Sequence, residues 1–121
     1  MNIDWNKLVT KTMKDAAAAS AALALAKVEL ASRNSLAVVQ IARIQDRVDT
    51  LGYGIDAGEA TEEDETEQAT LLINLKVWKA YKFSLGKVTA QPTWYVVPVW
   101  PNEPAILVIP ANPEAHASDL M

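Results

Sequence analysis

Apolar positions recur every three or four residues over much of the first half of the chain, which is the spacing of an amphipathic helix. The clearest stripe consists of Ile41, Ile44, Val48 and Leu51. Proline and glycine are absent from residue 7 to residue 51, and alanine, leucine, lysine, glutamate and glutamine are common there. All five residue types favour helix. The pattern therefore predicts one long helix over residues 7–51.

A seven-residue repeat runs along the same stretch. Steps of seven back from Ile44 meet only apolar residues, namely Ala37, Leu30, Leu23 and Ala16. The companion row is mixed and contains Ile41, Asn34, Lys27, Ser20 and Met13. One apolar row beside one mixed row is a weak coiled-coil signal.

A second apolar set on this helix, Leu25, Leu36 and Val39, lies off that seam, so the helix needs two neighbours. At about 1.5 Å per residue it is on the order of 60 Å long, which is more than this chain covers by itself. We therefore expect a homo-oligomer rather than an isolated monomer.

A second helix is predicted over residues 61–86. Gly52 follows the last apolar position of the first helix and suits the left-handed residue that often ends a helix. Thr61 is a good N-cap, and acidic residues follow it directly, although Asp64 stands where a capping box prefers glutamate or glutamine. Apolar positions continue to Leu85, before Gly86. Residues 1–88 are thus predicted to form a long helical hairpin.

The rest of the chain, residues 89–121, has a different pattern. Residues 93–97 and 105–109 are rich in β-branched and aromatic side chains, and all six prolines of the chain lie from Pro92 onward. Because proline cannot donate to a sheet ladder, these runs are predicted to be edge strands or an extended, β-like arm. The expected fold class is mainly α, a coiled-coil-like hairpin followed by this arm. The sequence leaves open whether the arm folds over the hairpin or pairs with another chain.

Composition excludes several classes of function. The chain has 121 residues, a formal net charge of −4 and no cysteine. An acidic chain lacks the basic stripe that nucleic acids require, and no thiol is present for catalysis or metal binding. The alanine-rich run from residue 16 to residue 26 is too short to span a bilayer. We expect no nucleic-acid or membrane partner and a cytoplasmic location.

No residue set indicates catalysis, a cofactor or a metal. The acidic run over residues 59–67 lacks the ligand spacing of a calcium loop. His116 is the sole histidine, and no second ligand accompanies it. Asp46 and Asp49 share a helix face and are interpreted as a polar face or as residues that fix the hairpin. The chain is predicted not to be an enzyme.

Large aromatic side chains indicate a contact surface instead. Trp78 is expected in the core between the helices, whereas Tyr81, which lies among lysines, is a candidate for exposed binding. Trp94, Tyr95 and Trp100 lie in an arm with no core of its own. Exposed apolar surface usually marks an interaction site, so these three residues are predicted to contact a partner.

The order of short motifs from residue 44 to residue 104 resembles the C-terminal region of the tail fibre assembly proteins of tailed bacteriophages. Four elements match: a Q-D-x-V-D helix end, A-T-E-E, W-K-x-Y-x-x-x-L-x-x-V and a final W-P-x-x-P. The matching residues are Gln45, Asp46, Val48, Asp49, Ala60, Thr61, Glu62, Glu63, Trp78, Lys79, Tyr81, Leu85, Val88, Trp100, Pro101 and Pro104.

The chain also departs from this pattern. Lys82 and Gly86 replace the arginine and asparagine that are usual in the family, glycines are inserted before Ala60, and the chain extends beyond Pro104. The large N-terminal module of many members is missing.

The resemblance implies a chaperone for tail fibre assembly. Such a protein binds the C-terminal tip of a trimeric tail fibre in the host bacterial cytoplasm, helps it to fold and trimerise, and then leaves or remains on the fibre tip of the virion. The expected contact residues are Trp94, Tyr95, Trp100, Pro101 and Tyr81. The alternative is a structural, oligomeric helical-bundle protein of a phage particle or bacterial assembly, with no chaperone role.

Overall fold

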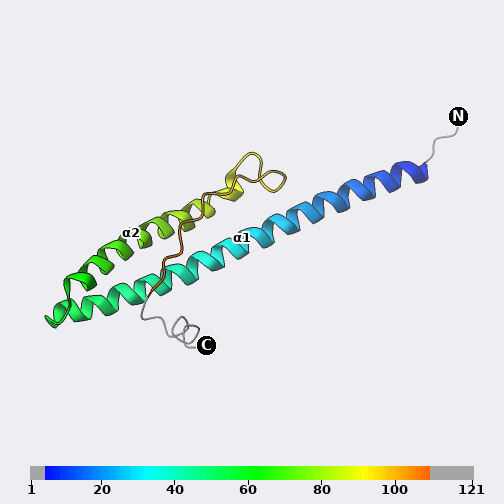
Figure 1. Ribbon diagram of the computed structural model, residues 1–121. Coiled ribbons are helices and arrows are strands. Elements are labelled where there is room, and N and C mark those ends of the chain that lie inside the picture. The colour runs from blue at the N-terminus through cyan, green and yellow to red at the C-terminus, as the bar shows by residue number, and fades with distance from the viewer. Residues whose placement is uncertain (1–4, 110–121) are drawn as a thin grey trace, which may run out of the picture.

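The computed structural model describes residues 5–109, with side chains from residue 11 onward. Helix α1 spans Trp5–Asp56, helix α2 spans Glu62–Leu85, and the short 3-10 helix η1 spans Val88–Ala90. The two long helices form an antiparallel hairpin, with α2 against the C-terminal part of α1 (Figure 1). The predictions of a mainly helical fold and of a helical hairpin are confirmed.

Helix α1 is longer than the sequence pattern predicted, because Gly52 does not end it. The helix passes through Gly52 and Gly54 and ends at Asp56. The left-handed backbone lies instead at Gly58, whose φ is 72°. The carbonyl of Gly54 accepts hydrogen bonds from the backbone N–H groups of Glu59 (2.9 Å) and Ala60 (3.2 Å). These two hydrogen bonds close the turn that follows the end of the helix.

Helix α2 begins as its sequence predicts. The Thr61 side chain accepts from the Asp64 backbone N–H at 3.1 Å, and the Asp64 carboxylate accepts from the Thr61 backbone N–H at 2.9 Å. Aspartate therefore completes the capping box here. The backbone hydrogen bond from Thr61, together with that of its side chain, lowers the pKa of Asp64.

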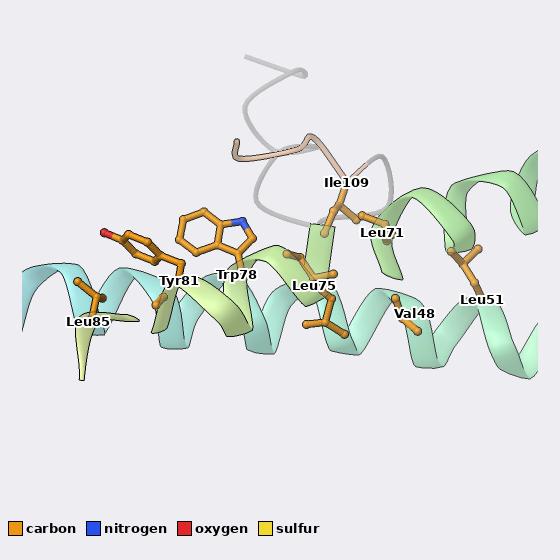
Figure 2. Packing of buried hydrophobic residues seen from close by; sticks show 10 residues of the cluster. Val48, Leu51, Leu71, Leu75, Trp78, Tyr81, Leu85 and Ile109 are labelled. Carbon is orange, nitrogen blue, oxygen red and sulfur yellow. The ribbon is translucent and has the colours of Figure 1, made fainter. Parts of the chain in front are cut away.

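The core is a single row of side chains between the helices (Figure 2). Trp78, Ile44, Leu85 and Val88 are its largest fully buried members. The cluster contains Ala37, Ile44, Val48 and Leu51 from α1, Leu71, Leu75, Trp78, Tyr81 and Leu85 from α2, and Ile109 from the arm. The predicted core position of Trp78 is confirmed.

Polar contacts fix how the helices align near the turn. The Arg47 guanidinium makes two hydrogen bonds to the Glu67 carboxylate, and these raise the pKa of Arg47. The Gln68 side chain donates to the Val48 carbonyl at 3.2 Å. The sequence analysis had suggested Asp46 and Asp49 for this role. The hydrogen bond of Asp49 instead comes from Gln45, on the same helix.

Much of α1 has no neighbour in the monomer. Helix α1 has 52 residues and α2 has 24, so their lengths are about 78 Å and about 36 Å. Residues 11–21 are all exposed, and the N-terminal part of α1 projects past the end of α2 (Figure 1). Leu25 and Val39, from the predicted second stripe, are 71% and 57% exposed, whereas Leu36 packs against the core. The expected second neighbour is therefore not supplied by the described residues of this chain.

The residues after η1 were predicted to form edge strands or an extended, β-like arm, and their described part contains no strand. Residues 92–96 form turns, residues 99–109 have no regular secondary structure, and no strand occurs within residues 5–109. In the turns, Trp94 N–H donates to the Gln91 carbonyl at 3.0 Å, and Val97 N–H donates to the Thr93 carbonyl at 2.9 Å. A β-branched run forms a strand only beside another strand, and the flanking prolines favour turns here.

Candidate protein-interaction surface

The arm folds back over its own hairpin in the single chain that the structure describes. The Ala105 carbonyl accepts hydrogen bonds from Trp78 Nε1 and Asn74 Nδ2, both at 3.1 Å. Arg43 donates to the Leu107 carbonyl, and Ile109 is 4% exposed, beside Leu71 (Figure 2). Three successive anchors therefore hold residues 105–109 along the hairpin.

Between α2 and this anchored segment, residues 91–100 form a loop at the open end of the hairpin (Figure 1). The Gln91 side chain closes the loop, because its Nε2 donates to the Val99 carbonyl at 2.7 Å and its Oε1 accepts from the Val99 N–H at 2.8 Å. One amide side chain thus satisfies both backbone groups of Val99, as a neighbouring strand would. The sequence analysis missed this residue, since a single glutamine before a proline carries no distinctive signal.

The aromatic residues of the loop pack in its interior and against α1. The rings of Trp94 and Trp100 meet edge to face with centroids 6.4 Å apart. The Arg33 guanidinium lies 4.8 Å from the centroid of the Trp100 ring and forms an ion pair with Glu29 at 2.8 Å. Partial burial alone lowers the pKa of Arg33, but hydrogen bonds with Tyr81 and Glu29 outweigh it and the pKa is raised.

Valines cover the outside of this loop. Val96, Val97 and Val99 are 70%, 63% and 64% exposed. Tyr95, directly before them, has a φ of 52°, a left-handed conformation that costs a non-glycine residue on the order of 1 kcal/mol. The fold therefore holds a strained backbone in place while it presents apolar side chains to solvent.

A groove joins this loop to α1. It has a volume of 290 Å³ and is lined by Ala22, Leu25, Ala26 and Glu29 from α1 and by Tyr95, Val96, Pro98 and Trp100 from the loop. Apart from Glu29, the lining is apolar or aromatic. We call this groove and the exposed valines Val96, Val97 and Val99 the loop surface.

Of the predicted contact residues, the structure places Tyr95 and Trp100 in the groove of the loop surface, and Trp94 packs against Trp100 in the same loop. Trp94, Tyr95, Trp100 and Pro101 are each partly buried. The expectation that Tyr81 is exposed is wrong. It is 3% exposed, and its ring packs against Trp78 with centroids 5.5 Å apart. Its helix position, three residues after Trp78, turns it into the core.

The exposed valines were not among the predicted contact residues. Their sequence signal is the run V-V-P-V, an apolar stretch in which a proline prevents regular strand pairing.

Residues 5–109 contain no cluster of three or more histidine, cysteine or acidic residues that is able to hold a metal ion. The acidic residues after Thr61 belong to the first turn of α2, where they face the positive end of the helix dipole. His116 lies outside the described residues.

Comparison of the chain with protein-family models, with curated proteins and with solved structures found no match. Over the described residues, none of the helices combines the length and the apolar character that a membrane crossing requires.

Proposed function

We propose that this chain is an assembly chaperone for a bacteriophage tail fibre and that its loop surface binds the C-terminal tip of the fibre chain. The observation that carries the proposal is the exposed valine loop, held next to the aromatic pair Trp94 and Trp100. The order of the sequence motifs, which resembles that of tail fibre assembly proteins, supports the same function.

The geometry of the loop fits a partner that has not yet trimerised. Long β-rich fibres expose apolar surface and strand edges before their chains associate, and this surface is prone to aggregation. Val96, Val97 and Val99 offer apolar contacts to such a segment. The buried centre of an interface is more apolar than its rim, and the aromatic residues Tyr95 and Trp100 beside the valines are of the types that contribute most to binding.

The loop also limits how a partner strand attaches. Both backbone groups of Val99 are occupied by Gln91, and Pro92, Pro98 and Pro101 have no N–H to donate. A bound strand therefore contacts side chains here and gains few backbone hydrogen bonds. The loop therefore favours reversible binding to the apolar surface of the fibre chain over continued addition of strands. We place this binding in the host bacterial cytoplasm or on the fibre tip of the virion.

The alternative is a structural part of a phage particle or bacterial assembly, formed by several hairpins packed as a bundle. The observation that favours this alternative is the projecting part of α1, whose described residues 11–21 are exposed. The alternative does not require the loop valines, so they separate the two functions.

The test is co-expression with the fibre chain encoded next to this gene, followed by affinity capture and measurement of trimeric fibre yield. We expect the double variant V96S/V97S to lose most of the capture and of the yield. The matched control is V38S/V39S, which also replaces two adjacent exposed valines, here in α1. The control is expected to behave as the unaltered chain.

Two outcomes contradict the proposal. One is full capture and fibre yield with V96S/V97S. The other is an equal loss in both double variants, because that result reflects general surface hydrophobicity and not the loop. Circular dichroism of both variants checks that the hairpin has formed.

A further inference from the structure

The face of α1 that α2 covers does not stop where α2 stops. Its core positions include Leu51, Val48, Ile44, Ala37 and Leu30. The same seven-residue rows continue toward the N-terminus through Leu23, Ser20, Ala16 and Met13, of which only Ser20 is polar. Leu23 is partly buried, whereas Ala16 and Met13 are exposed, Met13 by 66%. A helix-packing seam thus extends beyond the partner that covers its first part.

We propose that a second copy of this chain covers the free part of the seam, as an antiparallel pair of α1 helices related by a two-fold axis between residues 14 and 15. This pairing continues an interface that the hairpin already makes, because α2 is itself antiparallel to α1 (Figure 1). It does not depend on the proposed role in fibre assembly.

Two features agree on the position of this axis. First, the axis pairs residue 5 of one copy with residue 24 of the other, so the whole free length of each helix is covered and α2 is not displaced. The free segment of α1 in a second copy has the same length as the free segment in the first, so each segment covers the other completely. Such a two-fold contact is closed, so association stops at the dimer.

Second, this axis places side chains of complementary size together. Antiparallel alignment reverses one helix, so the Met13 row of one copy faces the Ala16 row of the other. With the axis between residues 14 and 15, Met13 lies level with Ala16 of the second copy, which joins a large side chain to a small one. Eight of the eleven residues from 16 to 26 are alanine, which permits the short interaxial distances of closely packed helices.

The first test is the mass of the full chain in solution, measured by sedimentation equilibrium over a range of concentrations. We expect a monomer–dimer equilibrium. The variant A16E places a carboxylate from each copy in the seam and is expected to weaken dimerisation by at least about tenfold, or 1.4 kcal/mol. The matched control A18E lies on the opposite face of α1 and is expected to leave the equilibrium unchanged.

The second test is disulfide trapping, which is direct because the chain has no cysteine. M13C and A16C, carried on separate chains of different length, are expected to cross-link when mixed, since disulfides require Cα atoms within about 7 Å. Each alone is expected to cross-link poorly. Self-cross-linking of both single variants indicates a parallel pair and overturns the proposal. A monomer at all concentrations, or equal effects of A16E and A18E, also overturns it.

Discussion

Two parts of one helix differ in what covers them. From residue 26 to residue 51, α1 lies beside α2 and places Ile44 and Leu51 in the core. From residue 11 to residue 21 it has the same repeat but no neighbour, and all of its side chains are exposed. The heptad pattern is common to both parts, so it does not specify the partner.

Side-chain size marks the difference between the two parts. The covered part contributes Ile44, Val48 and Leu51, together with the smaller Ala37, to the cluster that also contains Trp78 and Leu85. The uncovered part offers mainly alanine, which suits a second backbone at short distance. The lesson is that a continuous seam can serve an intramolecular partner at one end and another chain at the other.

The largest loss of stability is expected from Trp78→Ala, which removes a core side chain of α2. Trp78 is fully buried and donates to the Ala105 carbonyl, so its loss leaves a cavity and releases an anchor of the arm. We expect the free energy of unfolding, measured by urea denaturation, to fall by about 3–5 kcal/mol. Phe83→Ala, on the same helix but 69% exposed, is the control. It is expected to change stability by less than about 0.5 kcal/mol, and equal losses contradict the assigned core.

The next prediction compares the loss of stability at a buried position and at an exposed position of α1. Ile44→Ala removes a fully buried side chain, and we expect a loss of about 2–5 kcal/mol. Met13→Ala removes one that is 66% exposed, and the expected change in the monomer is within about 0.5 kcal/mol. Both losses are measured by urea denaturation. If Met13→Ala costs as much as Ile44→Ala at a concentration where the chain is monomeric, the contrast between the two parts of α1 is wrong.

The smallest effect is expected on the stability of the fold at low pH. The capping box lowers the pKa of Asp64 in the folded chain, so this carboxylate stabilises the fold above its unfolded pKa of about 3.9. That contribution is lost as the pH falls through the lower, folded value. We therefore expect the urea midpoint to decrease from pH 5 downward and the decrease to be shallower in Asp64→Asn. Identical pH profiles of the two proteins contradict this contribution.

The sequence predicted features within the helices better than the turn that connects them. Thr61 as N-cap, Gly86 just after α2 and Trp78 in the core each follow from residue type and helix spacing. The end of α1 did not, because a glycine such as Gly52 also fits inside a helix and the left-handed position is filled by Gly58.

The proposed contact surface was predicted in part. Trp94, Tyr95 and Trp100 were identified by their size, and they do lie in one loop. The valines beside them were predicted to lie in an edge strand or an extended arm, since β-propensity does not reveal whether a partner strand exists. The Gln91–Val99 clasp depends on a contact between residues eight positions apart, which no periodic pattern encodes.

The central claim is that α2 packs against one part of α1 and that the other part of α1 binds a second copy of the chain. Hydrogen–deuterium exchange resolved by peptide, recorded as the protein is diluted, tests it most directly. We expect amides of residues 30–51 to stay protected at every concentration and those of residues 11–24 to lose protection as the dimer dissociates. Equal, concentration-independent protection of both stretches would contradict the account.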